Sequence, residues 1–112
     1  MKKIEAVIRP SKLDEVKTAL SEYGINGITI TQVVGAGLQK GQTEFYRGNP
    51  IKINLLPKIK MEIITKDEMV EDIIKIITEN AQTGKVGDGK IFIYDVEGAV
   101  RIRTSEKDNE AL

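Results

Sequence analysis

The sequence predicts an α+β fold in which four strands and two helices alternate in the order βαββαβ. Three observations predict it: a strand-helix-strand pattern occurs twice, each helical pattern carries one apolar stripe, and a long glycine- and proline-containing segment, residues 35–57, separates the halves. Two such units form a four-stranded antiparallel sheet with both helices on one face, the split βαβ or ferredoxin-like arrangement. At 112 residues we expect one domain, residues 1–112.

The first half predicts a strand, a helix and a second strand. Lys3–Arg9 alternates charged and apolar residues as a half-buried strand does, and Pro10 ends it. Ser11 is expected to cap the helix and Gly24 to end it. The apolar stripe of that helix consists of Leu13, Val16, Leu20 and Tyr23. Ile28–Thr31 is the second predicted strand.

The second half repeats this plan with strands at Lys60–Ile64 and Ile91–Val96. Asp67 is expected to cap the helix between them. The buried stripe of that helix consists of Val70, Ile73, Ile74 and Ile77. In the last strand, apolar side chains alternate onto both faces of the sheet: Phe92, Tyr94 and Val96 on one, Ile91 and Ile93 on the other. The face without helices is therefore expected to pack on another subunit.

Composition excludes several classes of function. Seventeen basic and seventeen acidic residues give zero formal charge, which argues against a nucleic-acid partner. The absence of cysteine and histidine removes thiolate chemistry and the commonest general base and transition-metal ligand. The sequence shows no signal peptide and no membrane span, so a cytoplasmic protein is expected, with membrane contact only through a membrane-protein partner.

A glycine-rich turn, residues 83–90, is the strongest candidate for anion binding. Residues 84–90 fit G-x-x-x-x-G-K, but Ile91 replaces the magnesium-binding hydroxyl of a P-loop, and the helix precedes the turn instead of following it. Gly87 and Gly89 still allow backbone N–H groups to approach phosphate oxygens closely, and Lys90 adds charge. The alternative is an ordinary polar turn whose glycines supply positive φ.

Arg101 and Arg103 are the second candidate pair. In an extended chain, residues two apart project to the same side, and two guanidinium groups side by side match a polyphosphate. The alternative is a solvated edge strand in which Glu97 and Glu106 neutralise the arginines locally.

The segment 35–57 is interpreted as an interaction arm. A loop this long without secondary structure is uncommon in a compact domain and is usually functional or disordered. Tyr46, Arg47 and Gly48 place an aromatic ring, a long cation and a flexible residue in its middle, a combination typical of partner contacts. The alternative is a solvated excursion with an incidental arginine.

The whole chain closely resembles the PII nitrogen-regulatory protein family. The resemblance rests on Thr83–Ile93, Met1–Ile4, Gly35–Gly41, Thr43–Gly48, Leu56–Lys58 and Arg101–Thr104. It implies a homotrimer of ferredoxin-like subunits that binds ATP or ADP in the clefts between neighbours. It also implies a signalling protein that is not an enzyme.

The resemblance implies a ligand set as well. Gln39 would bind Mg²⁺ together with ATP and 2-oxoglutarate, and Lys58 would pair with a carboxylate of 2-oxoglutarate. The nucleotide-binding residues would be Thr29, Gly37, Ile64, Val86, Gly87, Asp88, Gly89, Lys90, Arg101 and Arg103.

The resemblance further implies that the arm inserts into target proteins, chiefly an ammonium transporter, glutamine synthetase or another nitrogen regulator. Three residues depart from the family pattern. Ile51 stands where many members carry a modifiable tyrosine, and Asn49 stands where some carry a phosphorylated serine, so neither modification is expected here. Leu38 replaces a common basic residue, which removes one expected phosphate contact.

Two other functions remain open from the sequence. A weak ATP-hydrolysing enzyme would need a positioned base, which the lack of histidine disfavours, and turnover above roughly 1 per second would support it. A ferredoxin-like trimer that binds a metal or small molecule without nucleotide is the other alternative. A nucleotide titration separates it from the nucleotide-binding regulator.

Overall fold

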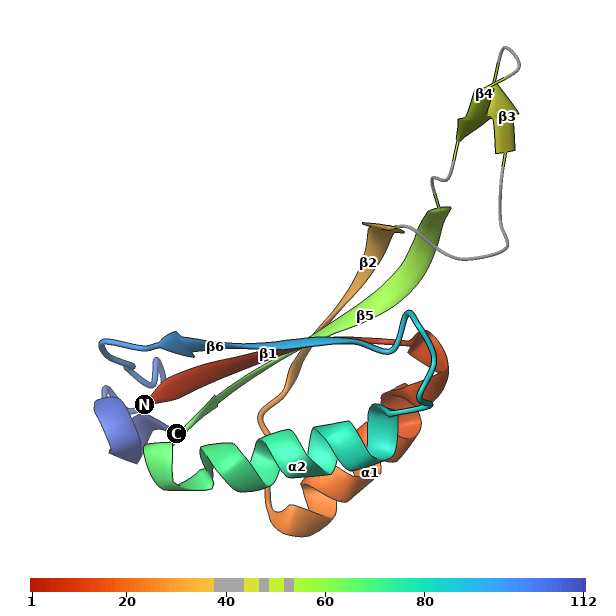
Figure 1. Cartoon of the computed structure of the whole chain (residues 1–112). Coiled ribbons are helices and arrows are strands. Elements are labelled where there is room, and N and C mark those ends of the chain that lie inside the picture. The colour runs from red at the N-terminus through yellow and green to blue at the C-terminus, as the bar shows by residue number, and fades with distance from the viewer. Residues whose placement is uncertain (38–43, 47–48, 52–53) are drawn as a thin grey trace.

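The computed structural model describes residues 1–37, 44–46, 49–51 and 54–112. The fold is a four-stranded antiparallel sheet with both helices on one of its faces (Figure 1). The strand order is β2-β5-β1-β6. The bounds are β1 Lys2–Ile8, β2 Thr29–Gly37, β5 Asn54–Thr65 and β6 Gly89–Asp95. This confirms the predicted ferredoxin-like α+β fold.

The two helices, α1 Leu13–Tyr23 and α2 Val70–Ala81, pack side by side beneath the sheet (Figure 1). Gly24 ends α1 with φ of +114°, as predicted, because only glycine adopts this conformation without strain. Both helices are amphipathic, and their buried residues are Val16, Leu20, Ile73, Ile77 and Ala81.

The predicted helix caps are wrong at both N-termini. Each helix is preceded by one 3-10 turn, η1 Pro10–Lys12 and η2 Asp67–Met69, and neither turn has a side-chain cap. Ser11 and Asp67 lie inside these turns instead of in front of them. Asp67 forms an ion pair with the Met1 ammonium group at 2.9 Å.

The hydrophobic core lies between the helices and the two central strands. It is built from alternate residues of β1 and β5, namely Ile4, Ala6, Ile8, Ile59, Met61 and Ile63. Because successive side chains of a strand point to opposite faces, the residues between them lie on the face without helices, called here the open face.

The open face is charged as well as aromatic, which corrects the expectation that it is mainly apolar. Tyr94 lies opposite Lys3 in the β1–β6 register. The Lys3 Nζ lies 4.5 Å from the centre of the Tyr94 ring and 3.5 Å from the Glu62 carboxylate. The Tyr94 hydroxyl donates a hydrogen bond of 3.1 Å to Glu5. Strand β6 ends at Asp95, one residue before the predicted end, so Val96 lies outside the strand.

The segment 35–57 contains more secondary structure than predicted. Residues 35–37 extend β2 and residues 54–57 extend β5, and the two stay paired to the Gly37–Asn54 position. Beyond them, β3 Glu44–Tyr46 and β4 Asn49–Ile51 form a separate two-stranded sheet at the far end of the projecting strands (Figure 1).

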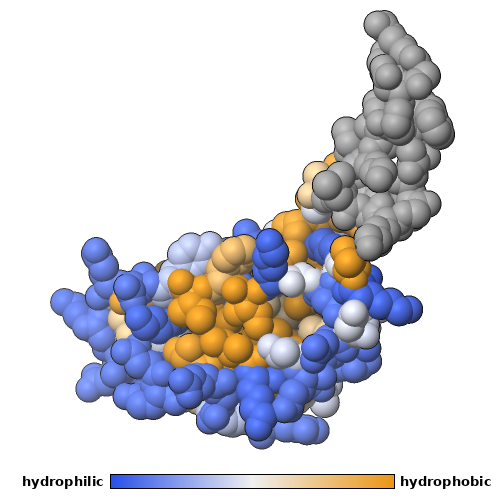
Figure 2. Space-filling model, in the orientation of Figure 1, coloured by the Kyte–Doolittle hydropathy of each residue, from blue (hydrophilic) through white to orange (hydrophobic). Residues whose placement is uncertain are grey.

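An apolar groove runs between β6 and α2, where Figure 2 shows hydrophobic side chains framed by hydrophilic ones. Within the part of the chain that the structure describes, β6 has a partner strand on one side only, and Ile93 is therefore 50 % exposed although it lies on the core-facing side. Among the described residues no helix is both long enough and apolar enough to span a membrane.

Candidate functional site

A cavity of ≈ 550 Å³ opens where β5 extends past its neighbour β2. The pairing with β2 begins at Thr29 opposite Glu62, so Ile63–Thr65 has no strand on that side among the described residues. Backbone groups of a free strand edge are available to a ligand. The cavity is lined by Gly24, Ile25, Asn26, Gly27, Thr29, Glu62, Ile64, Thr65, Lys66, Met69, Ala111 and Leu112.

The lining of this cavity suits a flat, partly polar ring. Ile64, which is 37 % exposed, offers an apolar surface, and Thr29 a hydroxyl. Glu62 adds a carboxylate that ion-pairs with Lys3 at 3.5 Å and Lys60 at 3.8 Å. Thr29 and Ile64, both predicted from the sequence, are thus brought together, whereas Glu62 was not predicted.

Arg101 and Arg103 lie in a turn and not in an extended strand, so the sequence-based argument for their shared direction is wrong. The Ser105 N–H donates to the Arg101 carbonyl at 2.8 Å and closes that turn. The predicted local neutralisation occurs at Arg101, whose Nη1 lies 3.2 Å from Glu106. Among the described residues Arg103 forms no ion pair and is exposed.

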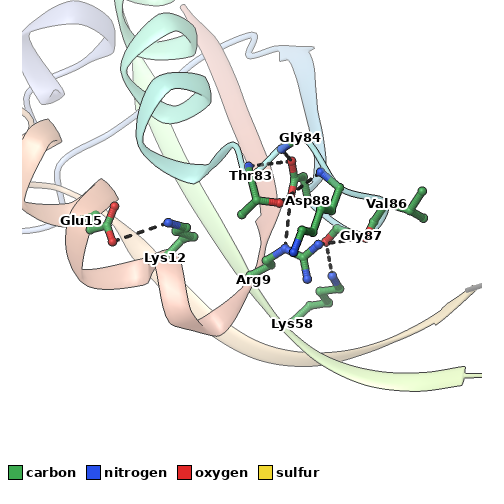
Figure 3. A network of polar contacts seen from close by, with 10 residues as sticks. Arg9, Lys12, Glu15, Lys58, Thr83, Gly84, Val86, Gly87 and Asp88 are labelled. Carbon is green, nitrogen blue, oxygen red and sulfur yellow. Dashed lines mark hydrogen bonds and ion pairs between the residues drawn. The ribbon is translucent and has the colours of Figure 1, made fainter.

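The glycine turn, defined here as residues 83–89, is organised around the Asp88 carboxylate (Figure 3). Asp88 accepts hydrogen bonds of 2.8 Å from the N–H groups of Thr83 and Gly84, and another from the Thr83 hydroxyl. These bonds, that of the Thr83 hydroxyl foremost, hold the pKa of Asp88 well below its usual range. Its carboxylate thus fixes the backbone of the turn.

Two cations from other strands hold the same turn (Figure 3). Arg9, just after β1, lies 3.1 Å from Asp88 through Nε and donates from Nη2 to the Val86 carbonyl at 2.9 Å. Lys58 of β5 donates to the Gly87 carbonyl. Burial, with the nearby positive charge of Arg9, lowers the pKa of Lys58. Two cationic side chains therefore lie beside Gly87, and the Asp88 carboxylate balances the charge of one of them.

The glycines of this turn are required by its geometry. Gly84, Gly87 and Gly89 all have positive φ, between 85° and 108°. A Cβ at Gly89 would lie 1.7 Å from the Val7 carbonyl oxygen, because β1 and β6 approach closely there. The Gly89 requirement is thus steric, and the turn keeps its backbone free of side chains where an anion would approach.

The cavity and the glycine turn lie at opposite ends of the sheet. In the β1–β6 register Gly89 lies opposite Ile8, whereas Asp95, which leads to the arginines, lies opposite Lys2. Six residue steps of strand separate these two positions, about 20 Å at 3.3 Å per residue. Figure 1 shows the turn at one end and the C-terminal residues at the other.

Comparison with known proteins gives the family. The family described as "Nitrogen regulatory protein P-II" matches residues 1–106. The chain belongs to the P-II family. It is 57 % identical to "Nitrogen regulatory protein P-II" of Pasteurella multocida and 56 % identical to that of Haemophilus influenzae. It is 53 % identical to "Nitrogen regulatory protein P-II 1" of Escherichia coli, and each alignment covers both chains completely.

This P-II chain divides its predicted site residues into two groups. The turn end of the sheet carries Gly37, Lys58, Val86, Gly87, Asp88, Gly89 and Lys90. The cavity end carries Thr29, Ile64, Arg101 and Arg103. Leu38, Gln39, Arg47 and Gly48 lie outside the described residues, and Tyr46 is described only as part of β3.

The sequence reasoning missed Arg9, Glu62 and Gly27. Arg9 contacts Asp88, which is 79 positions away, so only the pairing of β1 with β6 relates them. Glu62 lies opposite Thr29 in the β2–β5 register, and Gly27 precedes Thr29 by two residues; both line the cavity. The position of Arg9 directly before Pro10, at the end of a strand, was the one available signal.

Proposed function

We propose that this P-II protein is a cytoplasmic, non-enzymatic regulator of nitrogen metabolism that binds ATP or ADP at the subunit interfaces of a homotrimer. One observation supports the nucleotide proposal: groups suited to the two parts of a nucleotide lie at opposite ends of the sheet. The cavity end offers a ring pocket and two arginines. The turn end offers a glycine-rich backbone with lysines beside it.

The two halves cannot serve one nucleotide within a single chain, because about 20 Å of strand lies between them. Thr29, Glu62 and Ile64 lie on the open face at one end, and Lys90, opposite Val7, lies on it at the other. A second copy packed on the open face would bring its turn to the first copy's cavity. A cyclic trimer repeats that contact three times and closes.

The cavity half supports recognition of adenine. The free edge of β5 at Ile63–Thr65 offers backbone groups to the polar edge of a base, and Ile64 offers a surface for the ring. The phosphates would then reach Arg101 and Arg103 from this chain and Gly87, Gly89 and Lys90 from the neighbour.

The turn half supports a second, dicarboxylate ligand. We propose that Lys58 pairs with a carboxylate of 2-oxoglutarate and that Gln39 binds Mg²⁺ together with ATP and that ligand. Lys58 is suited to this role because it points at the turn backbone and lies beside Arg9. When held by Gln39, Mg²⁺ would supply positive charge to both anionic ligands, so the binding of one would favour the binding of the other.

We propose that the arm contacts the target proteins. Strands β2 and β5 project beyond the helices, and the β3–β4 sheet, which contains Tyr46, lies at the far end of these strands (Figure 1). We propose an ammonium transporter, glutamine synthetase or a nitrogen regulator as its target. Because Ile51 and Asn49 lack hydroxyls, ligand state and not modification at these positions would control it.

Mixed trimers test this function. Lys90→Ala damages the turn half and Arg103→Ala the cavity half, and each homotrimer should bind ATP about 10- to 150-fold more weakly. Co-refolded mixed trimers should regain one tight site, where an intact turn meets an intact arginine. Calorimetry gives the stoichiometry. Unchanged ATP affinity in both variants would refute the proposed nucleotide site. Absence of a tight ATP site in the mixed trimers would refute the proposal that two subunits share each site.

A further inference from the structure

The chain after β6 folds back on itself and reaches the cavity. Val100 and Lys107 form a β-bridge, and the Asp108 N–H donates to the Ala99 carbonyl at 2.7 Å. The last 3-10 turn, η3 Asp108–Ala111, then brings Ala111 and Leu112 into the cavity wall. Residues 99–112, called here the C-terminal segment, therefore border the ring pocket of the same chain.

Within this segment Arg101 already has oxygen partners. Its Nη1 lies 3.2 Å from the Glu106 carboxylate, and its Nη2 donates to the Leu112 carbonyl at 3.3 Å. Glu106 is fixed in turn by the Thr104 hydroxyl, which donates to it at 2.7 Å. Two of the five guanidinium N–H donors, one on each terminal nitrogen, thus bind oxygens of the segment itself.

The charge of the segment also opposes an anionic ligand. Residues 105–112 contain three acidic side chains, Glu106, Asp108 and Glu110, against one lysine. A nucleotide polyphosphate that approached Arg101 in this arrangement would meet the Glu106 carboxylate, and like charges repel. A phosphate group would therefore compete with the Glu106 carboxylate for the positive charge of Arg101.

The segment is held in a backbone conformation that favours release. Ser105 has φ of +63° and Asp108 has φ of +55°, and they are the non-glycine residues with positive φ among those described. The left-handed region is disfavoured for residues with a Cβ. In contrast, every positive-φ position of the glycine turn is a glycine.

We propose that residues 105–112 compete with the nucleotide inside the same chain, with Glu106 occupying Arg101 until a phosphate group displaces it. This inference rests on the proposed nucleotide site and adds a regulatory element to it. Binding then has two steps at Arg101: the Glu106 ion pair opens, and the segment moves away from the cavity. The strength of that ion pair sets part of the apparent affinity.

Three matched variants test the competition by calorimetry with Mg-ATP on the trimer. Glu106→Gln weakens the half-exposed ion pair and should tighten binding about two- to fivefold. Ser105→Gly relieves the left-handed residue, stabilises the closed segment and should weaken binding by a similar factor. Glu110→Gln removes the same charge from the same segment and should bind as the wild type does.

Weaker binding by Glu106→Gln would overturn the proposal, since Glu106 would then orient Arg101 for the ligand. Equal tightening by Glu110→Gln would overturn it too, because only net charge would matter. Failure of wild-type protein to bind ATP would instead refute the proposed function.

Amide hydrogen exchange gives a second, direct readout. The Arg101 N–H donates to the Glu106 carbonyl at 2.8 Å and the Asp108 N–H to Ala99, and both bonds close the segment. Saturating ATP should speed exchange at these two amides, because the segment is displaced. Slower exchange at both would show that the segment closes over the nucleotide and would overturn the competition.

Discussion

The glycine turn and the C-terminal segment carry charged groups at opposite ends of one sheet, yet they hold them differently. In the turn, the Asp88 carboxylate binds the turn's own N–H groups, so it stabilises the backbone that faces outward. In the segment, the Glu106 carboxylate binds Arg101, the side chain proposed to face the ligand. In the proposed site, Asp88 would hold the phosphate-binding backbone in place, whereas Glu106 would compete with the phosphate for Arg101.

Backbone conformation shows the same contrast. The turn uses glycine wherever φ is positive, so its shape costs little. The segment places Ser105 and Asp108 in that region. A preformed half contributes affinity without reorganisation, whereas a half that must rearrange makes affinity adjustable. In the proposed nucleotide site, the turn would fix where the phosphates bind, and the segment would set how readily they bind.

The largest effect is expected where the turn meets β1. Gly89→Ala would place a Cβ 1.7 Å from the Val7 carbonyl oxygen, so β1 and β6 must separate locally. We expect a loss of about 3–5 kcal/mol in the free energy of unfolding, measured in urea. Gly24→Ala is the matched control: its φ is +114° but nothing lies within 4 Å, and its cost should be about 1 kcal/mol. Equal costs would show that φ and not the close approach requires glycine.

A smaller effect is expected from Asp88→Asn, and it should depend on pH. The folded-state pKa of Asp88 is lowered, so its stabilisation is present above the ordinary value of 3.8 and is lost as pH falls towards the folded pKa. The variant should therefore melt several degrees lower than wild type at pH 7, and the gap should close as pH falls below about 4.

Asp108→Asn is the counterpart in the C-terminal segment, where one bond of 3.3 Å to Ala99 is at stake. Its melting temperature should differ little from wild type at neutral pH. A larger drop than that of Asp88→Asn would reverse the contrast between the two regions.

The smallest effect concerns the charge of Lys58. Burial and Arg9 lower its pKa below 10.5, so the side chain loses its proton at a lower pH than an ordinary lysine does. The proposed 2-oxoglutarate affinity should therefore decline as pH rises towards that lowered pKa. Calorimetry between pH 7 and pH 10 should show the decline in wild type and a flatter profile in Lys58→Arg. Parallel pH profiles for wild type and Lys58→Arg would show that Lys58 does not pair with the dicarboxylate.

The elements with strong periodicity were predictable from sequence. Lys3–Arg9 alternates clearly, and the isoleucines of α2 recur at helical spacing, so both were placed within a residue or two. The outer halves of β2 and β5 were missed because Gly35, Gly37 and Pro57 read as loop signals. There, pairing between the two strands overrides the local preference of each residue.

The candidate site was predictable as a list of residues but not as a geometry. The glycines of the turn, Thr29 and Ile64 all follow from sequence and family resemblance, and the structure assigns them to two ends of the sheet. The ion pair between Arg9 and Asp88 could not be predicted, because it depends on the register between β1 and β6. The predicted helix caps were wrong because a 3-10 turn moved the N-cap from Ser11 to Lys12 in α1 and from Asp67 to Met69 in α2.

Strand β5 is a single run of 12 residues, Asn54–Thr65, and its length fixes the spacing of the groups along it. Glu62 and Ile64 line the cavity, Lys58 contacts the glycine turn, and Asn54 lies at the outer end of the pairing with β2. Since side chains alternate with a period of two, inserting one residue between Lys58 and Glu62 would turn one of these groups to the wrong face. Change in length should therefore be tolerated in the arm and rejected within residues 58–64, whatever the inserted residue is.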